Sequence, residues 1–451
     1  MTSEERMGML RDMEVPRLLA KMGAPTMVGM LVTGLYSIVD ACFVGGLGTQ
    51  QMGAISIVFP LSQVLSGLGL LFGGGASSYI SRLLGAGDRR MAGRVASTAL
   101  YSSLAVGAVT LAAIELFLGA LLSALGATGT IMPYAVEYAR VFALSAPITI
   151  AATTLNNILT SEGAARLSMS AMLLGAAVHV ALDPVLIYAA GMGIVGSAIS
   201  TVASQTMVLA IYLSYILRGR SAFSFAPREF LPSGKVFGQI FKVGVPNLVF
   251  QLFTSLAMWL TTTAAHPYGD EAIAAMGIVT RVMAMGTLAV FGFMKGFQPV
   301  AGYSYGAGRF DRLWEAVKVA ALWSTLFCAC ATAVFVAFPG AIVSLFSSDP
   351  GVVAMASSAL RANSALFVFF GIGAEYALLY LALGRSLGGL LLSIGRQGLF
   401  FVPAVLLLPG AFGFAGVVFA QPAADALTLV TIVVLAGRIN REIRSEAAAR
   451  A

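Results

Sequence analysis

Two ionisable side chains lie close together inside a long apolar stretch of the sequence. His179 and Asp183 fall within residues 167–190, a segment long and apolar enough to cross a bilayer as one helix. Their spacing of four residues places them on the same helical face. Ionisable groups at membrane depth are costly and usually face a protein interior or water. An imidazole and a carboxylate placed in this way predict a site for a proton or another cation.

Two further polar residues are predicted at a similar depth. Asp40 and Asp183 each precede a glycine-marked turn at the end of their span by eight residues, and Thr201 follows such a turn by eight. At the helical rise per residue, all three lie about 12 Å from that end of the membrane, and His179 lies about 6 Å deeper. We interpret the four as cation-coupling or proton-coupling residues. The structural alternative is that the acids bond neighbouring helices and that Thr201 bonds its own backbone.

The composition indicates a polytopic membrane protein. Of the 451 residues, 58% are hydrophobic and 10% are charged, and the mean hydropathy is +0.89. Soluble domains carry about 25% charged residues, so a soluble core is excluded. The three cysteines lie in apolar segments without a Cys/His cluster, which favours neither a disulfide framework nor a zinc site.

Twelve apolar segments predict twelve membrane spans. They cover residues 18–45, 52–80, 93–123, 132–160, 167–190, 193–217, 239–265, 271–303, 313–346, 351–381, 386–409 and 412–437. All but five of the 27 Lys and Arg residues fall in the terminal segments and in alternate loops, which predicts that those parts face the cytoplasm. The net charge of +7 therefore reports topology and not nucleic-acid binding. We expect a multi-pass protein of the cytoplasmic (inner) membrane with both termini cytoplasmic.

The chain divides into two similar halves. Residues of the first half that recur 221 positions later include Pro25, Gly75 and Gly85-Ala86-Gly87, with Pro246, Gly296 and Gly306-Ala307-Gly308 as their counterparts. We predict an all-α fold of two pseudo-symmetric six-helix bundles. The N-terminal lobe covers 1–217, a cytoplasmic linker covers 218–238, and the C-terminal lobe with a cytoplasmic tail covers 239–451. Six spans in each half make the repeats parallel, with a central cavity between them, as in transporters.

Polar and adaptable side chains of other spans are predicted to line this cavity. The candidates are Tyr138, Met172, Gln251, Lys295, Gln298 and Glu375. Lys295 and Glu375 are also candidates for a buried ion pair. The acids of the coupling site belong to the N-terminal half alone, because the repeat spacing pairs Asp40 with Thr261 and Asp183 with Pro403.

Two motif-based enzyme classes are poorly supported. The Gly85-Ala86-Gly87 turn lacks the Lys-Ser/Thr ending and the strand context of a phosphate-binding loop. The longest polar loop, residues 218–238, is too short for a nucleotide-binding domain. An intramembrane aspartyl protease would need a Gly-x-Gly-Asp element, which neither Asp40 nor Asp183 has. We therefore expect no enzyme activity, no catalytic residue, no cofactor and no ATPase subunit.

The order of several motifs resembles the multidrug and toxic compound extrusion (MATE) family across nearly the whole chain. These motifs are Val39-Asp40-x-x-Phe-Val-Gly45, Leu182-Asp183-Pro184, Gly191-Met192-Gly193 with Gly196-Ser-Ala198, and Gln298-Pro299 with Gly302-Tyr303. The pattern is closest to the prokaryotic DinF-type branch. The resemblance implies a V-shaped pair of bundles that exports organic cations, drugs or toxic metabolites by alternating access, in exchange for protons or sodium. It also implies that Tyr138 and Asn156 are the cavity tyrosine and asparagine of the fourth span and that Thr201 is the threonine of the sixth. We assign Asn156 and Thr201 to the coupling site and Tyr138 to the substrate cavity.

His179 departs from this branch, which usually has asparagine at that position. Asparagine offers a neutral oxygen to sodium, whereas the histidine nitrogen titrates near neutral pH. The sequence therefore favours proton coupling, with a sodium site at Asp40, Asp183 and Thr201 as the alternative. A flippase for a lipid-linked precursor is the second function class; Lys295 would suit a phosphate headgroup, but the two acids would repel it. We expect a monomer that acts on a small amphipathic cation, without a nucleic-acid partner.

Overall fold

Helices and helical turns make up all the regular secondary structure of the computed structural model, which describes residues 2–450. The α-helices are α1 (Ser3–Asp12), α2 (Val15–Gly45), α3 (Thr49–Gly85), α4 (Arg89–Ala124), α5 (Met132–Ala143), α6 (Ser145–Ser161), α7 (Ala165–Pro184), α8 (Gly193–Leu217), α9 (Gly234–Ala265), α10 (Asp270–Gly306), α11 (Phe310–Ala337), α12 (Pro339–Val343), α13 (Pro350–Ser364), α14 (Phe370–Ala382), α15 (Ser386–Ile394), α16 (Phe401–Phe412) and α17 (Phe414–Arg450). The shorter turns are η1 (Val185–Ala189), η2 (Pro227–Glu229), η3 (His266–Tyr268), η4 (Phe367–Phe369) and η5 (Gly395–Leu399). The predicted all-α fold class is confirmed.

The described residues contain ten helical segments that are each long and apolar enough to cross a membrane, and two bent pairs bring the number to twelve. In one pair, α5 and α6 meet at 48°; in the other, α13 meets the segment Phe367–Ala382 at 43°. This number agrees with the twelve predicted spans. The span that begins with α7 changes to a π-helical turn, η1, directly after Pro184. Proline has no backbone N–H to continue the regular helical hydrogen bonds, which accounts for the change at that point.

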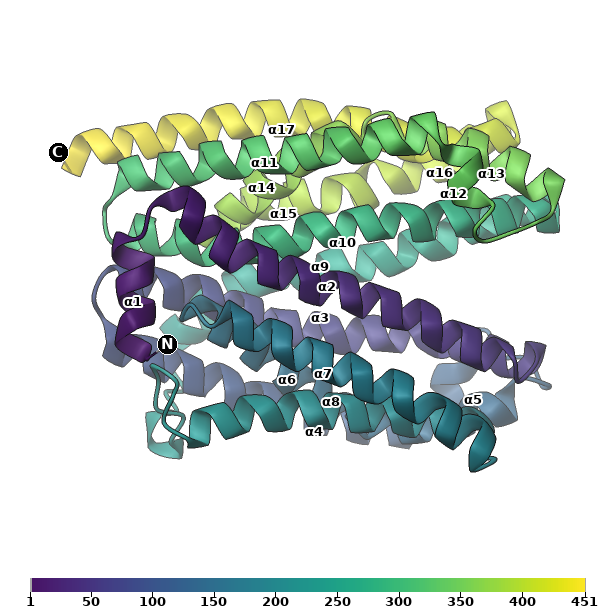
Figure 1. Ribbon diagram of the computed structural model, residues 1–451, viewed down its shortest axis with the longest axis horizontal. Coiled ribbons are helices and arrows are strands. Elements are labelled where there is room, and N and C mark those ends of the chain that lie inside the picture. Colours follow the sequence, from purple (N-terminus) through teal and green to yellow (C-terminus); the bar gives the residue numbers. More distant parts are fainter. Residues whose placement is uncertain (1, 451) are drawn as a thin grey trace.

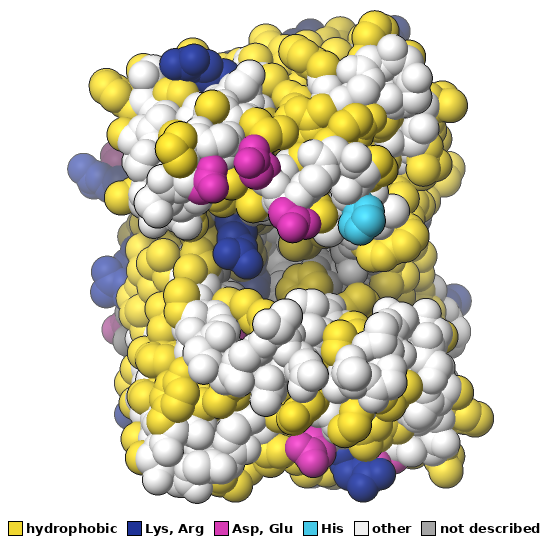
Figure 2. All heavy atoms as spheres, turned by 90° about the vertical axis from the view of Figure 1, so that its right-hand side faces the viewer, with side chains coloured by type: hydrophobic (Ala, Val, Ile, Leu, Met, Phe, Trp, Pro, Cys, Tyr) yellow, Lys and Arg dark blue, Asp and Glu magenta, His cyan; other side chains and the backbone are white. Residues whose placement is uncertain are grey.

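The helices form two bundles that converge toward one end of the molecule (Figure 1). Helices α2–α8 make up one bundle and α9–α17 the other, and the contacts between bundles run mainly along the pairs α3–α9 and α2–α10. Both termini lie at the end where the bundles converge, which we call the terminal end (Figure 1). The opposite face is hollowed between the bundles (Figure 2). The hollow therefore opens away from the termini.

The repeated glycines of the sequence lie where helices of the two bundles cross. A Cβ atom on Gly75 of α3 would lie 2.1 Å from the carbonyl oxygen of Ile240 in α9. A Cβ atom on Gly296 of α10 would lie 2.5 Å from the Cα atom of Gly23 in α2. Side-chain carbons do not approach backbone atoms this closely, so these crossings require residues without a Cβ. The pseudo-symmetry of the sequence thus reappears as two equivalent contacts between the bundles.

Helix α1 lies across the terminal end and contacts both bundles. The Arg6 guanidinium lies 3.3 Å from the Glu162 carboxylate, and both side chains are buried. Glu162 follows α6, so this pair joins α1 to the N-terminal bundle. Arg312 of α11 donates to the Met13 carbonyl oxygen just beyond α1, at 2.6 Å. Helix α1 is therefore held between the two bundles on the side away from the hollow.

We expect Arg6→Ala to lower the thermal stability of the protein. The variant would leave the Glu162 carboxylate buried without its partner cation, a change that costs about 3–5 kcal/mol in buried ion pairs. Thermal unfolding of the purified protein measures the loss. The double variant Arg6→Ala/Glu162→Gln should recover part of the stability, because it removes the buried charge as well.

Arg17→Ala is the matched control for that experiment. Arg17 forms an ion pair with Glu14 at 3.2 Å, but both side chains are more than two-thirds exposed. Exposed ion pairs contribute little to stability, so this variant should unfold like the wild type. Equal unfolding temperatures for Arg6→Ala and Arg17→Ala would contradict a stabilising role of the buried pair.

Candidate cation-coupling site

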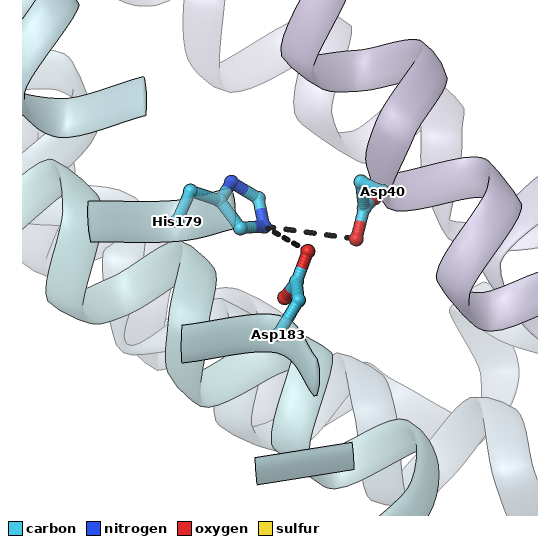
Figure 3. A group of neighbouring side chains, drawn as sticks. All are labelled: Asp40, His179 and Asp183. Atoms are coloured by element: carbon cyan, nitrogen blue, oxygen red, sulfur yellow. Dashed lines mark ion pairs between the residues drawn. The ribbon is translucent and has the colours of Figure 1, made fainter. Parts of the chain in front are cut away.

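Asp40, His179 and Asp183 come together between α2 and α7 (Figure 3). His179 Nε2 lies 3.6 Å from Asp40 Oδ1 and 3.4 Å from Asp183 Oδ2. One possible ligand atom from each of the three residues lies within 4.8 Å of the other two. The two α7 residues are one helical turn apart, and the packing of α2 along α7 brings Asp40 to them. We call these three residues the acid–histidine cluster.

The acid–histidine cluster is largely withdrawn from solvent. The exposed fraction of the side chain is 1% for Asp183, 5% for His179 and 19% for Asp40. Among the described residues, His179 Nε2 and both carboxylate oxygens of Asp183 are buried and have no hydrogen-bond partner. Most buried polar atoms in proteins do have a partner. Two carboxylates in such a setting repel each other unless a proton or another cation neutralises them.

Two residues that the sequence reasoning missed support the cluster. Ser197 of α8 donates a hydrogen bond to Asp40 Oδ1 at 3.0 Å. The Tyr36 ring packs against the His179 imidazole, with 5.1 Å between ring centroids. Both carried a usable signal: Tyr36 lies one turn before Asp40 on α2, and Ser197 lies within the Gly196-Ser-Ala198 motif. Together they fix the positions of the carboxylate and the imidazole.

Thr201 and Tyr138 lie beside the cluster. The Thr201 hydroxyl donates to the Ser197 carbonyl oxygen of its own helix at 3.1 Å, which is the structural alternative considered for this threonine. Helix α5, which carries Tyr138, packs along α8, which carries Thr201 and Ser197. The Tyr138 ring is buried and stacks on Phe142, with 5.8 Å between ring centroids. A direct role of Thr201 as a cation ligand stays a prediction.

Asn156 does not lie in the acid–histidine cluster with which it was grouped. By the helical rise, Asn156 lies about 8 Å from the terminal end of α6, whereas Asp183 lies about 27 Å from the terminal end of α7. Asn156 instead donates through Nδ2 to the Tyr212 hydroxyl at 2.5 Å. Its Oδ1 accepts a hydrogen bond from Lys295 Nζ, across the junction of the two bundles. Asn156 was predicted to share a site with Asp183, but the two residues lie at different depths along the bundle.

Lys295 and Glu375 do not form the ion pair that was considered for them. Within the described chain, the polar partner of Lys295 is Asn156. Glu375 of α14 is fully buried, and neither of its carboxylate oxygens has a hydrogen-bond partner among the described residues. The same is true of the Gln298 side-chain nitrogen on α10. The C-terminal bundle thus contains buried polar groups, but no second cluster of acidic and histidine side chains among the described residues.

Two other predicted cavity residues pack at helix crossings. Gln251 of α9 lies against Gly67 of α3, where a Cβ on the glycine would meet the Gln251 Cβ at 3.5 Å. The Met172 sulfur of α7 would lie 2.9 Å from a Cβ on Gly29 of α2. Both side chains are partly exposed. Gln251 and Met172 pack between neighbouring helices, and a role of either side chain in binding the substrate stays a prediction.

The fold and the site together define a class of protein. Twelve spans in two repeated bundles, with buried ionisable groups between helices, are the plan of a membrane transporter. The MatE family model matches residues 25–185 and, a second time, residues 246–405. Each match falls in one bundle, and their starts differ by the spacing of the repeated glycines. The chain belongs to the MATE family.

Similar proteins extend this relationship over more than nine-tenths of the chain. The multidrug export protein MepA of Staphylococcus aureus (strain NCTC 8325 / PS 47) is 30% identical over 416 residues, which cover 91% of each chain. MepA of Staphylococcus haemolyticus is 29% identical over 426 residues, 94% of each chain. A solved structure of a multidrug resistance MATE family transporter in an outward-facing conformation has a TM-score of 0.91 at 26% identity, covering 97% of this chain and 98% of that one. The predicted family is confirmed; its DinF-type branch stays a prediction.

Proposed function

We propose that this protein exports organic cations, drugs or toxic metabolites in exchange for protons, by alternating access. The observation that carries the proposal is the acid–histidine cluster, in which His179 Nε2 and both Asp183 carboxylate oxygens are buried without hydrogen-bond partners among the described residues. Groups of this kind inside a membrane are characteristic of ion and substrate pathways. A proton gained or lost there changes the charge of a site enclosed by apolar helices.

The substrate class follows from charge and from the relatives. A cluster with two carboxylates attracts a cation and repels a phosphate headgroup, which disfavours the flippase alternative. The relatives named multidrug export protein support a drug or a toxic metabolite as the exported molecule. A proton and a cationic substrate cannot both neutralise the same carboxylates. Protonation from one side therefore expels the substrate, and loss of the proton on the other side restores binding.

His179 is the reason for preferring protons to sodium. Its Nε2 faces both carboxylates at 3.4 Å and 3.6 Å, where an oxygen ligand would be needed to complete a sodium shell. Imidazole exchanges protons near neutral pH. The cluster can therefore pass a proton among three groups without a rearrangement of helices.

The direction of access follows from the hollow and from the basic residues. The concentration of Lys and Arg residues at the terminal end supports a cytoplasmic position for that end. The hollow opens on the opposite face (Figure 2), so this conformation receives protons from outside the cell. The inward-facing state requires the bundles to separate at the glycine crossings.

Transport in proteoliposomes of known orientation tests the coupling ion. A proton gradient and a sodium gradient are imposed separately, and the movement of a fluorescent quaternary ammonium dye is recorded. We expect the proton gradient alone to drive the dye uphill, and the sodium gradient alone to have no effect. Liposomes without protein and liposomes with the Asp40→Asn/Asp183→Asn variant are the controls.

Uphill movement that needs sodium would contradict the proton proposal while leaving cation-coupled export in place. A dye that responds to neither gradient, in liposomes whose protein content has been verified, would contradict export of organic cations. Transfer of a fluorescent lipid between leaflets in the same liposomes would then support the flippase.

A further inference from the structure

We propose that the acid–histidine cluster is also a binding site for a divalent transition-metal ion of the zinc class. The site uses one oxygen each from Asp40 and Asp183 and the Nε2 atom of His179. The binding itself is inferred from geometry and charge alone. Its effect on export rests on the proposed function.

The distances within the cluster suit such an ion. Zinc binds imidazole nitrogen at about 2.0–2.1 Å and carboxylate oxygen at about 2.0–2.2 Å, so neighbouring ligand atoms of a tetrahedral site lie about 3.4 Å apart. His179 Nε2 already lies 3.4 Å from Asp183 Oδ2 and 3.6 Å from Asp40 Oδ1. All three ligand atoms fall within 4.8 Å of one another. Two edges of the coordination tetrahedron are therefore preformed, and small side-chain rotations close the third.

The buried atoms of the cluster that lack a hydrogen bond point to a bound ligand and not to a packing contact. His179 Nε2 and the carboxylate oxygens of Asp183 are buried without hydrogen-bond partners among the described residues. Figure 3 shows Nε2 and the two carboxylates directed toward a common point between α2 and α7. The Asp40 side chain is 19% exposed, which leaves an approach for the ion and a place for water as the fourth ligand.

Charge and ligand type select the class of metal. Two carboxylates and a neutral imidazole carry two negative charges, so a divalent ion leaves the buried site neutral and a monovalent ion does not. The imidazole nitrogen favours zinc and similar transition ions over Mg²⁺ and Ca²⁺, which prefer oxygen ligands. The metal specificity thus comes from His179, the residue that departs from asparagine.

Equilibrium binding of Zn²⁺ to the purified full-length protein, free of any polyhistidine tag, tests the site. We expect one ion per chain, bound without competition from Mg²⁺. His179→Asn should weaken the binding by at least about tenfold, since even changes behind the direct ligands cost that much. His179→Gln is measured in parallel, and both variants must match the wild type in gel filtration and thermal unfolding before their affinities are compared.

His266→Asn is the matched control, because His266 is the second of the two histidines in the chain and lies in η3, outside the cluster. It should bind Zn²⁺ like the wild type. Binding that is equal in the wild type and in both His179 variants, or lost in His266→Asn, would overturn the proposal. Co²⁺ bound in place of Zn²⁺ should give the visible spectrum of a tetrahedral nitrogen–oxygen site. A sulfur-to-metal charge-transfer band would place the ion at a cysteine and overturn the assignment.

Transport separates this inference from the proposed function. Zn²⁺ added on the side of the hollow should slow proton-driven export by the wild type and by His266→Asn to the same degree. Zinc binding in a protein that exports no cation would overturn the proposed function and leave the metal site standing. Export without any zinc binding would overturn the metal site alone.

Discussion

Replacement of Asp183 by asparagine is expected to reduce uphill dye export to the level of protein-free liposomes. The Asp183 carboxylate is 1% exposed, and asparagine has nearly the same shape but cannot carry the negative charge or the proton. The amide removes the charge partner of His179 Nε2, 3.4 Å away, but breaks no hydrogen bond within the described chain. The folded protein should persist, and the coupling should be lost. Uphill export in proteoliposomes and thermal unfolding of the same preparation measure the two effects separately.

Glu115→Gln is the matched control for Asp183→Asn. Glu115 of α4 also lies within a span, but its side chain is 35% exposed and faces Arg140 of α5 at 3.7 Å. An exposed pair of this kind contributes little, so export should remain near the wild-type rate. Wild-type export by Asp183→Asn, or equal losses in both variants, would remove the acid–histidine cluster from the mechanism.

The sequence predicted most of the cluster because its signals are local. Ionisable residues in apolar segments are rare and costly, so His179 and Asp183 stood out, and their spacing of one turn made them neighbours before any tertiary contact was known. Asp40 needed a second argument, the absence of an acid at the matching position of the other repeat. The structure brings all three together.

Asn156 and Lys295 show what local signals could not supply. The contact between them crosses from one bundle to the other, and it depends on how α6 and α10 are rotated and placed in depth. Sequence spacing fixes neighbours within one helix only. The considered pairing of Lys295 with Glu375 matched opposite charges, but opposite charges on different helices do not fix which partners meet.

The internal repeat was identified from glycines and prolines that recur 221 positions apart. The structure gives the physical reason why the glycines recur. Gly75 and Gly296 are 221 residues apart in the chain, and each lies at a crossing where the helix of the other bundle approaches without room for a side chain. The sequence showed that these positions recur, but it could not show that they form the contact between bundles, because the partner helix is remote in sequence. Under the alternating access that we propose, this contact is where the bundles would part.

Gly296→Ala is expected to separate the bundles at the terminal end and to slow export at least about tenfold. The added Cβ would lie 2.5 Å from the backbone of Gly23, and backbone atoms cannot rotate away as a flexible side chain does. A clash of this size displaces helices, so the hollowed conformation loses stability relative to one with the crossing open. Spin labels on Arg166→Cys, at the start of α7, and on Lys318→Cys, in the third turn of α11, report the separation when the three native cysteines are replaced. Their distance distribution should shift to longer values.

Gly277→Ala, on the same helix α10, is the matched control, since nothing lies within 4 Å of its added Cβ. It should keep the wild-type distance and the wild-type export rate. Gly75→Ala should behave like Gly296→Ala, because its Cβ would meet the Ile240 carbonyl oxygen at 2.1 Å in the symmetry-related crossing. If Gly296→Ala and Gly277→Ala gave the same distances and rates, the glycine crossings would serve only to pack the helices and would not control the opening of the terminal end. If Gly75→Ala and Gly296→Ala both open the terminal end, the two crossings act as one gate, and the internal repeat of the sequence exists in part to build it.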